Sequence, residues 1–365
     1  MRRRDPLAVR GRWLPGTRAF SALSRRVRAL LLTAVLFLVL FVLALTLPVP
    51  YVILSPGPTY NTLGTDDSGR QIIVINGTKA NATDGHLNMT TVDVSTAPLN
   101  AFDAISGWLM HDQVVVPKAA IFPPGQSEQQ VNQQNSQDFS QSQDNAIAAA
   151  SCELGYPRRF GVITVNGAGA SYQALEPVDE IRTLDGNPAD NDTLLFALLS
   201  KAVPGTKVAI GILRQGKTKT VSITLGKPLA GRRGGSLGIV VGQVCQPPFA
   251  VDLGLGNQIG GPSAGLMFAL GIMDKVGRVN LTKGLFIAGT GTIDPSGNVG
   301  PIGGIQLKMI AARQAGATVF LAPVGNCADV RGAIPGGLRV VKVDSLHHAV
   351  LDLQAIQRGQ SLPHC

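Results

Sequence analysis

One stretch decides the fold of the C-terminal part of the chain: Gln258-Ile-Gly-Gly-Pro-Ser263-Ala-Gly-Leu-Met-Phe-Ala-Leu-Gly-Ile-Met273. Two glycines followed by Pro262 suit the first turn of a helix. The apolar run beyond them predicts a helix that is buried on all sides and ends near Gly277. Ser263 then lies in the first turn, where unpaired N–H groups and the helix dipole can stabilise an oxyanion. A serine at a helix start is ordinarily a cap, and that alternative stays open on this stretch alone.

A second buried helix is predicted at 305–315, after a hairpin and a glycine turn. Lys308 shares one stripe of this helix with Ile305 and Ala312, so it projects from the face that should be buried. The helix contains no acid that could pair with it. Burial without a partner favours the neutral amine, which can act as a general base near neutral pH. The alternative is a lysine that extends along the helix to reach solvent.

Together these stretches resemble the proteolytic domain of Lon proteases. Residues 261–265 match the GPSAG nucleophile motif of that family, and 301–304, with Lys308 four residues later, match its PIGGxxxK motif. The resemblance implies a Ser-Lys dyad, with Ser263 as nucleophile, Lys308 as general base and Thr290 in support.

Some features depart from that family. Gly260 stands where an acid is common, and Thr292 replaces a glutamate.

Residues 211–218 match the phosphate-binding pattern G-x-x-x-x-G-K-[ST], but alternating polar and apolar residues on both sides predict a β-hairpin. We therefore reject a nucleotide site and expect no ATPase half.

Residues 160–226 are predicted to form a separate unit. Within it, 174–186 resembles a segment of the PDZ domains found in bacterial proteases, with Val178 where glycine is usual. PDZ domains bind an extended peptide as an added strand and often hold its carboxylate on backbone N–H groups. The alternative is a small α+β domain that only packs against its neighbours. The residues expected to bind peptide are Gly161, Val162 and Ile163.

The N-terminus combines a basic tail with an apolar helix. Residues 1–28 carry nine arginines against one acid, Asp5, which supplies +8 of the formal net charge of +9. Residues 29–47 contain only Thr33 and Thr46 as polar members, which is long enough to cross a membrane as a helix. The positive-inside rule then places 1–28 in the cytoplasm and the rest outside the cell membrane. A cleaved signal peptide is the alternative. The near-neutral remainder of the chain offers no electrostatic footprint for nucleic acid.

The whole exported chain resembles the PDZ-containing, membrane-anchored Lon-like proteases of Gram-positive bacteria (the YlbL type), through residues 55–59 and 86–92. Strands are expected at 71–75 and 87–92, a mobile glutamine-rich loop at 126–143, and a helix from about 140 to 154. The PDZ unit could be inserted within the protease fold. The expected α+β organisation is a basic tail (1–28), a transmembrane helix (29–48), an exported segment (49–155), a PDZ-like domain (156–228) and a Lon-type proteolytic domain (229–365).

The function expected from these features is an ATP-independent serine endopeptidase that cleaves peptides or unfolded exported proteins. It needs no cofactor and no metal, and the resemblance to Lon implies a homo-oligomer. The strongest alternative is a non-catalytic PDZ adaptor that regulates another membrane protease. A Ser-His-Asp hydrolase is weaker because no G-x-S-x-G motif surrounds Ser263, and a zinc peptidase is disfavoured because no H-E-x-x-H occurs. The histidines available to it are His86, His111, His347, His348 and His364.

Four cysteines allow three disulfide pairings in an exported chain. None of them has C-x-x-C spacing, so a structural zinc site is not expected. Cys365, at the C-terminal end of the sequence, is the cysteine expected to stay unpaired.

Overall fold

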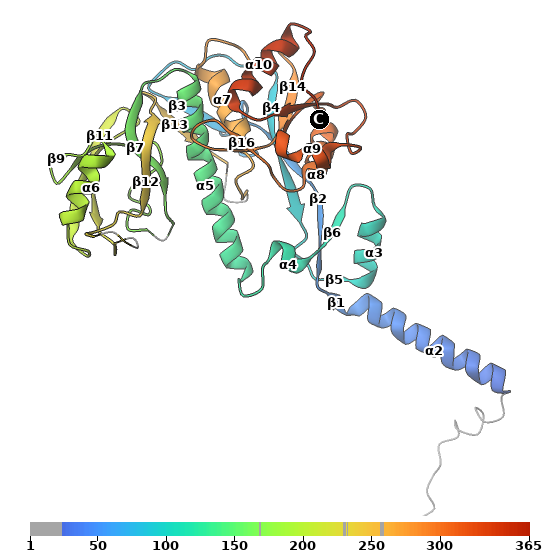
Figure 1. Ribbon diagram of the computed structural model, residues 1–365. Coiled ribbons are helices and arrows are strands. Elements are labelled where there is room, and N and C mark those ends of the chain that lie inside the picture. The colour runs from blue at the N-terminus through green and yellow to red at the C-terminus, as the bar shows by residue number, and fades with distance from the viewer. Residues whose placement is uncertain (1–23, 168, 229–230, 232, 256–258) are drawn as a thin grey trace, which may run out of the picture.

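A computed structural model describes residues 24–365 except 168, 229–230, 232 and 256–258. Most of the expected basic tail, residues 1–23, lies outside the described residues. Helix α2 (Arg25–Thr46) begins at the N-cap Ser24 and has no buried residue. It projects away from the rest of the chain (Figure 1) and is long and apolar enough to cross a membrane.

The first of two six-stranded sheets has the strand order β18–β17–β14–β4–β2–β6. Strand β14 pairs in parallel with both β4 and β17, so strands from two distant parts of the chain share this sheet. The α+β prediction is confirmed. The strands are β2 (Tyr51–Asn61), β4 (His86–Val94), β6 (Val114–Pro117), β14 (Phe286–Gly289), β17 (Val319–Pro323) and β18 (Arg339–Val343).

Helices cover both faces of this sheet. Alternate residues of each strand point to opposite faces, so neighbouring strand residues pack in different cores. Ile287 and Leu321 pack in one core with α7 (Gly265–Val276) and α10 (Leu346–Gln357). Their neighbours Ala288 and Phe320 pack in another core with α8 (Ile305–Gln314) and α9 (Cys327–Val330). The two segments expected to carry chemistry, before α7 and on α8, are therefore brought together across the sheet.

Short elements complete this part of the molecule. Strand β1 pairs with β5, β3 with β13, and β15 with β16. Their bounds are β1 (Pro48–Val49), β3 (Ile73–Asn76), β5 (Leu99–Asn100), α3 (Ala101–Leu109), α4 (Lys118–Ile121), β13 (Ala250–Leu253), β15 (Thr292–Ile293), β16 (Val299–Gly300) and the 3-10 helix η1 (Val324–Asn326).

A second sheet has the strand order β11–β10–β8–β7–β12, and β9 pairs with β8. Residues 211–218 lie on the β10–β11 hairpin, as expected, so they cannot cradle a phosphate. Strand β12 lies beyond residue 228, where the PDZ-like unit was expected to end, and pairs with β7 at the edge of the sheet. The elements are β7 (Arg158–Val165), β8 (Glu180–Leu184), β9 (Asn187–Pro188), α6 (Asp192–Lys201), β10 (Lys207–Arg214), β11 (Lys217–Thr224) and β12 (Ile239–Cys245).

Helix α5 (Glu128–Glu153) lies between the two sheets (Figure 1) and contacts both α7 and β12. The mobile loop predicted at 126–143 is therefore wrong. Ser127 and Gln130 form a capping box that starts the helix, and glutamine is a good helix former. Val131 and Phe139 are buried, so tertiary packing stabilises a segment whose composition is polar.

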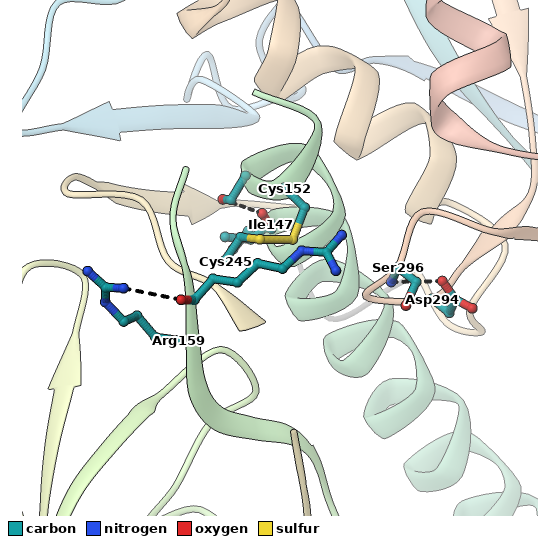
Figure 2. The surroundings of a disulfide bond; sticks show 8 residues. Ile147, Cys152, Arg159, Cys245, Asp294 and Ser296 are labelled. Carbon is teal, nitrogen blue, oxygen red and sulfur yellow. Dashed lines mark hydrogen bonds between the residues drawn. A yellow bond between two sulfur atoms is a disulfide. The ribbon is translucent and has the colours of Figure 1, made fainter. Parts of the chain in front are cut away.

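Both disulfides form between distant segments. Cys152 bonds to Cys245, which ties the end of α5 to the end of β12 (Figure 2). Cys327 bonds to Cys365, so the prediction that Cys365 stays unpaired is wrong. The C-terminal tail returns to the first sheet, where the Lys342 N–H donates to the Pro363 carbonyl, and this brings Cys365 to α9.

Candidate active site

Ser263 lies in a turn directly before α7, whose first residue is Gly265. Ser263 was expected in the first turn of this helix, but it precedes the helix, whose N-cap is Ala264. The Ser142 hydroxyl of α5 donates to the Pro262 carbonyl at 2.8 Å and holds the turn in place. A Cβ on Gly265 would lie 2.6 Å from Ile293 Cγ2, so only glycine lets the turn approach β15 this closely.

Lys308 reaches the serine from α8. Its Nζ donates to Ser263 Oγ at 2.8 Å, to the Thr90 carbonyl at 2.8 Å and to Thr290 Oγ1 at 3.2 Å. The side chain is only 4% exposed, so it does not reach solvent. Helix α8 starts at Gly304 with φ +68, where a Cβ would lie 2.9 Å from Val92 Cγ2. Glycine therefore sets the start of the helix that aims Lys308 at Ser263.

The environment of Lys308 favours the neutral amine. All three hydrogen-bond acceptors of Nζ within the described residues are neutral oxygens. Burial lowers the pKa of Lys308 from its ordinary value of 10.5 to about 8. About a tenth of the lysine is then unprotonated at pH 7, and the fraction rises with pH, so the side chain can act as a general base.

Thr290 links the two ends of the pair. Its hydroxyl donates to the Ser263 carbonyl at 3.0 Å and accepts from Lys308 Nζ. The Gly291 N–H also donates to the Ser263 carbonyl at 2.9 Å. Thr290 is completely buried, so these contacts are shielded from water.

Sequence reasoning missed the Thr90 carbonyl on β4. It is the second 2.8 Å acceptor of Lys308 Nζ, 218 residues away in sequence. A backbone carbonyl has no side-chain signature, so only the pairing of β4 with β14 could have revealed it.

Ser263 and Lys308 open into a cleft of about 350 Å³. Within the described residues, the N–H groups of Ser263 and Ala264 make no hydrogen bond and remain available beside Ser263 Oγ. The walls are formed by β2, β4 and the loops before α7 and α8: Pro58, Tyr60, Met89, Thr90, Thr91, Val92, Asp93, Ile259, Gly260, Gly261 and Gly303.

Comparison with known proteins agrees with this geometry. Residues 258–355 match the Lon protease (S16) C-terminal proteolytic domain. The C-terminal part of this chain is a Lon-type proteolytic domain. It is 32% identical over 110 residues to the Lon protease of Syntrophomonas wolfei, and 35% identical over 97 residues to Lon protease 2 of Bacillus subtilis. These alignments cover 28% and 27% of this chain but only 13% and 17% of the relatives' lengths.

Residues 131–225 match the PDZ domain family. The PDZ domain of an SdrC-like protein from Listeria monocytogenes is 20% identical and covers 22% of this chain and 85% of that chain, with a TM-score of 0.21. A TM-score this low adds nothing about the present fold. The family match alone supports the PDZ prediction.

In the PDZ unit, the residues expected to bind peptide lie within a strand and not in a loop. Gly161, Val162 and Ile163 belong to β7, which has β8 on one side and β12 on the other. Val162 is completely buried and its N–H donates to the Asp179 carbonyl. Strand pairing on both sides of Gly161 leaves no free edge there for a peptide strand, and the carboxylate loop at 161–163 stays a prediction.

An open groove lies instead between α6 and the edge strand β12. It has a volume of about 300 Å³ and a mainly apolar lining, with Arg233 at one side. Sequence reasoning missed it because the unit was ended before β12. Its apolar lining residues are Leu195, Phe196, Leu199, Leu237, Ile239 and Val241.

None of the five histidines, all of them in the described part of the chain, lines the cleft of the Lon-type domain. His347 pairs with Glu153 and His348 with Asp344 at the surface, and His86 stacks on Phe286. A Ser-His-Asp mechanism at Ser263 therefore lacks its base.

Proposed function

We propose that this chain is a membrane-anchored serine endopeptidase in which Ser263 and Lys308 form the catalytic dyad. One observation carries the proposal. A lysine that is 4% exposed, with no carboxylate among its hydrogen-bond partners, donates to the hydroxyl of a serine at 2.8 Å. Removing a lysine from water without a counter-ion is unfavourable, so a functional requirement for a neutral amine accounts for it.

The proposed reaction passes through an acyl-enzyme. Neutral Lys308 takes the proton of Ser263 as Oγ attacks the substrate carbonyl, and the N–H groups of Ser263 and Ala264 hold the oxyanion. Protonated Lys308 then gives its proton to the leaving amine. Water, deprotonated by the same lysine, hydrolyses the ester and releases the serine. Thr290 and the Thr90 carbonyl position Nζ throughout.

The substrates we propose are flexible or unfolded segments cleaved without ATP. Residues 90–94 of β4 have β2 on one side, whereas β14 pairs only with residues 86–89 on the other. An extended peptide can therefore lie along the free side of 90–93, beside Ser263. Only a chain that is locally unfolded can adopt this extended form.

We further propose that the PDZ unit is inserted within the protease fold and recruits extended peptides. Its inserted position is supported by the first sheet, which combines strands from before and after it. In the groove along β12, a peptide would add to the sheet edge beside α6. The Leu237 N–H, which makes no hydrogen bond within the described residues, and Arg233 would hold its carboxylate. Gly161–Ile163 is not part of this proposal.

The proposed location of the catalytic part is the outer side of the cell membrane, with the N-terminus in the cytoplasm. Arginines cluster at the N-terminal end of α2 and not at its C-terminal end, which fits the positive-inside rule. Both disulfides suit an oxidising compartment. Assembly into a homo-oligomer remains an expectation from the Lon resemblance.

The test compares the wild-type chain with the Ser263→Ala and Lys308→Ala variants on unfolded casein, with fragments identified by mass spectrometry. We expect cleavage by the wild type and by neither variant. Equal cleavage by all three would contradict the dyad. No casein cleavage by any of the three would contradict an autonomous peptidase and favour the non-catalytic PDZ adaptor.

A further inference from the structure

Helix α3 turns its apolar face outward. Phe102, Ile105, Trp108 and Leu109 recur at helical spacing, a pattern that ordinarily marks the buried side of a helix. Their exposed fractions are 59%, 59%, 76% and 69%. A continuous exposed apolar face of this kind is unusual for a surface helix and marks an interaction site.

The opposite side of α3 is firmly held against the protein. Gly107 is buried, and a Cβ at this position would lie 2.9 Å from Ile53 Cδ1 and 3.2 Å from Val115 Cγ2. At the start of the helix, Asn100 and Asp103 form a capping box. The helix therefore cannot rotate to bury its apolar face without losing both contacts.

The position of α3 is tied to the end of α2. Helix α2 ends at Thr46, and β1 follows it and pairs with β5, Pro48 with Asn100 and Val49 with Leu99. Helix α3 starts at the residue after β5, beside the point where the chain leaves α2 (Figure 1). Contacts join α2 and α3 directly. Exposed apolar side chains also follow each helix in the chain, Leu47 and Tyr51 after α2 and Met110 after α3.

We propose that α3 lies in the outer interface of the membrane that α2 spans, with this face inserted among the lipid acyl chains. The inference rests on the proposed anchor, since a membrane boundary near Thr46 brings the face of α3 to the lipid surface. Tryptophan and phenylalanine are favoured at this depth. A second copy of the chain is the competing occupant, but α3 contacts α2, and both helices expose apolar side chains, which favours lipid.

The chemistry of the face points to uncharged lipid. Asp103 is the one charged residue between 101 and 110, and its side chain is used in the capping box. No lysine or arginine borders the apolar residues within this helix. Insertion is therefore driven by burial of apolar surface and needs no anionic headgroup. The consequence is a second attachment point that fixes the orientation of the catalytic part relative to the membrane.

The test uses Trp108 as its own reporter. The chain has two tryptophans, so Trp13→Phe leaves Trp108 alone. This full-length chain would be reconstituted in phosphatidylcholine vesicles. We expect Trp108 to lose most of its emission when the lipid acyl chains carry bromine, and to be protected from iodide in the water. Quenching by iodide alone overturns the proposal. Protection from both quenchers overturns it in favour of a protein partner such as a second copy.

Two further variants separate α3 from α2. Adding Phe102→Ser and Ile105→Ser should expose Trp108 to iodide while the chain still floats with vesicles through α2. Val203→Ser, at a valine 64% exposed in the PDZ unit, is the matched control and should leave the quenching unchanged. If the unaltered chain does not float, the anchor fails and this inference with it, whereas casein cleavage by the dyad is tested separately. A double variant quenched like the wild type would also overturn the role of the face.

Discussion

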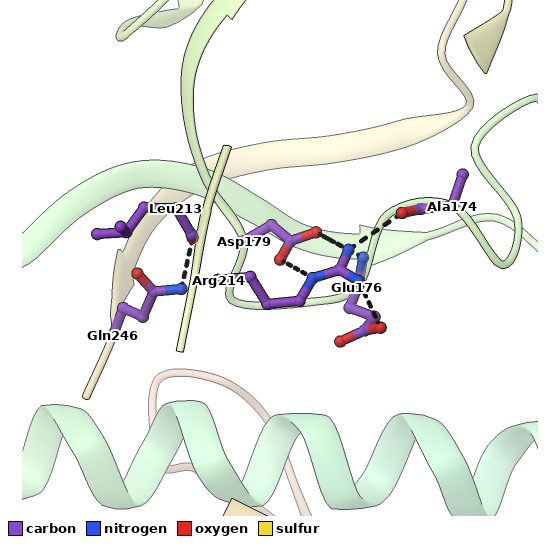
Figure 3. A network of polar contacts seen from close by, with 6 residues as sticks. All are labelled: Ala174, Glu176, Asp179, Leu213, Arg214 and Gln246. Carbon is purple, nitrogen blue, oxygen red and sulfur yellow. Dashed lines mark hydrogen bonds and ion pairs between the residues drawn. The ribbon is translucent and has the colours of Figure 1, made fainter. Parts of the chain in front are cut away.

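Lys308 is buried and Arg214 is mostly buried, with a side chain 13% exposed, but the groups that surround the two cations differ in charge. Arg214 bonds both Asp179 oxygens, at 2.7 and 2.6 Å, and Glu176 at 2.7 Å (Figure 3). Lys308 has only neutral acceptors among the described residues. Burial acts to lower the pKa of both. For Arg214 the hydrogen bond and charge of Asp179, with the charge of Glu176, outweigh burial and raise the pKa, whereas for Lys308 burial is unopposed.

The difference separates structure from chemistry. A buried cation with carboxylate partners holds its proton and ties strands together, because the charges stabilise each other. A buried cation without them has an accessible neutral form and can accept a proton. Lys275 lies between these cases, since burial lowers its pKa while Asp274 opposes the shift.

The largest effect is expected from Lys308→Arg. Arginine keeps the charge but does not lose its proton, so the general base is removed. We expect casein cleavage to fall by roughly 10³-fold or more. Lys275→Arg is the matched control, a buried lysine at the end of α7 that bonds Gln71 and should leave cleavage near the wild-type rate. An active Lys308→Arg enzyme would break the distinction between the two cations.

Arg214→Met should act on stability. Asp179 is 1% exposed and would be left as an uncompensated buried charge, so we expect a loss of about 3–5 kcal/mol in the free energy of unfolding. Denaturant titration of the detergent-solubilised chain measures it. Arg182→Met is the control, because the Arg182 side chain is 48% exposed and its pair with Glu180 should contribute less than about 1 kcal/mol. Equal losses in the two variants would contradict a structural role specific to Arg214.

The smallest effect is expected from Asp144→Asn, which tests how the charges around Arg214 act on a neighbouring carboxyl. Burial and the charges of Glu176 and Asp179 raise the pKa of Asp144 from 3.8 to about 8. The unfolded carboxyl loses its proton first, so its contribution to stability is full below pH 4 and is lost as pH rises to about 8. Because part of the side chain is exposed, we expect Asp144→Asn to stabilise by only about 1 kcal/mol at pH 7 and hardly at pH 4.

Thermal unfolding at the two pH values measures this difference. The same gain at pH 4 and pH 7 would show that packing, and not ionisation of Asp144, distinguishes the variant.

The approach of Lys308 to Ser263 could be predicted from sequence because both residues sit in short segments whose local structure is set by neighbouring residues. Proline and glycine mark the helix starts at α7 and α8, and periodicity alone puts Lys308 on the buried face of α8. The Thr90 carbonyl could not be predicted, because only strand pairing brings it to the lysine.

Errors arose where distant contacts override local composition. The first half of α5 is polar in sequence, but its buried Val131 and Phe139 pack in the folded chain. Strand β12 joins the PDZ sheet from beyond the expected boundary, so the apolar groove lies beside β12 and not at Gly161–Ile163. The apolar residues of α3 show the reverse case, since a pattern typical of a buried face is exposed beside α2.

The most direct test of the account is the pH dependence of casein cleavage, measured as initial rates at low substrate concentration. The lowered pKa of Lys308, about 8, predicts a rate that rises with pH through a single ionisation and reaches a plateau above that value. A midpoint near about 6.5, the ordinary value for histidine, or a rate independent of pH between 6 and 9, would contradict a neutral Lys308 as the base.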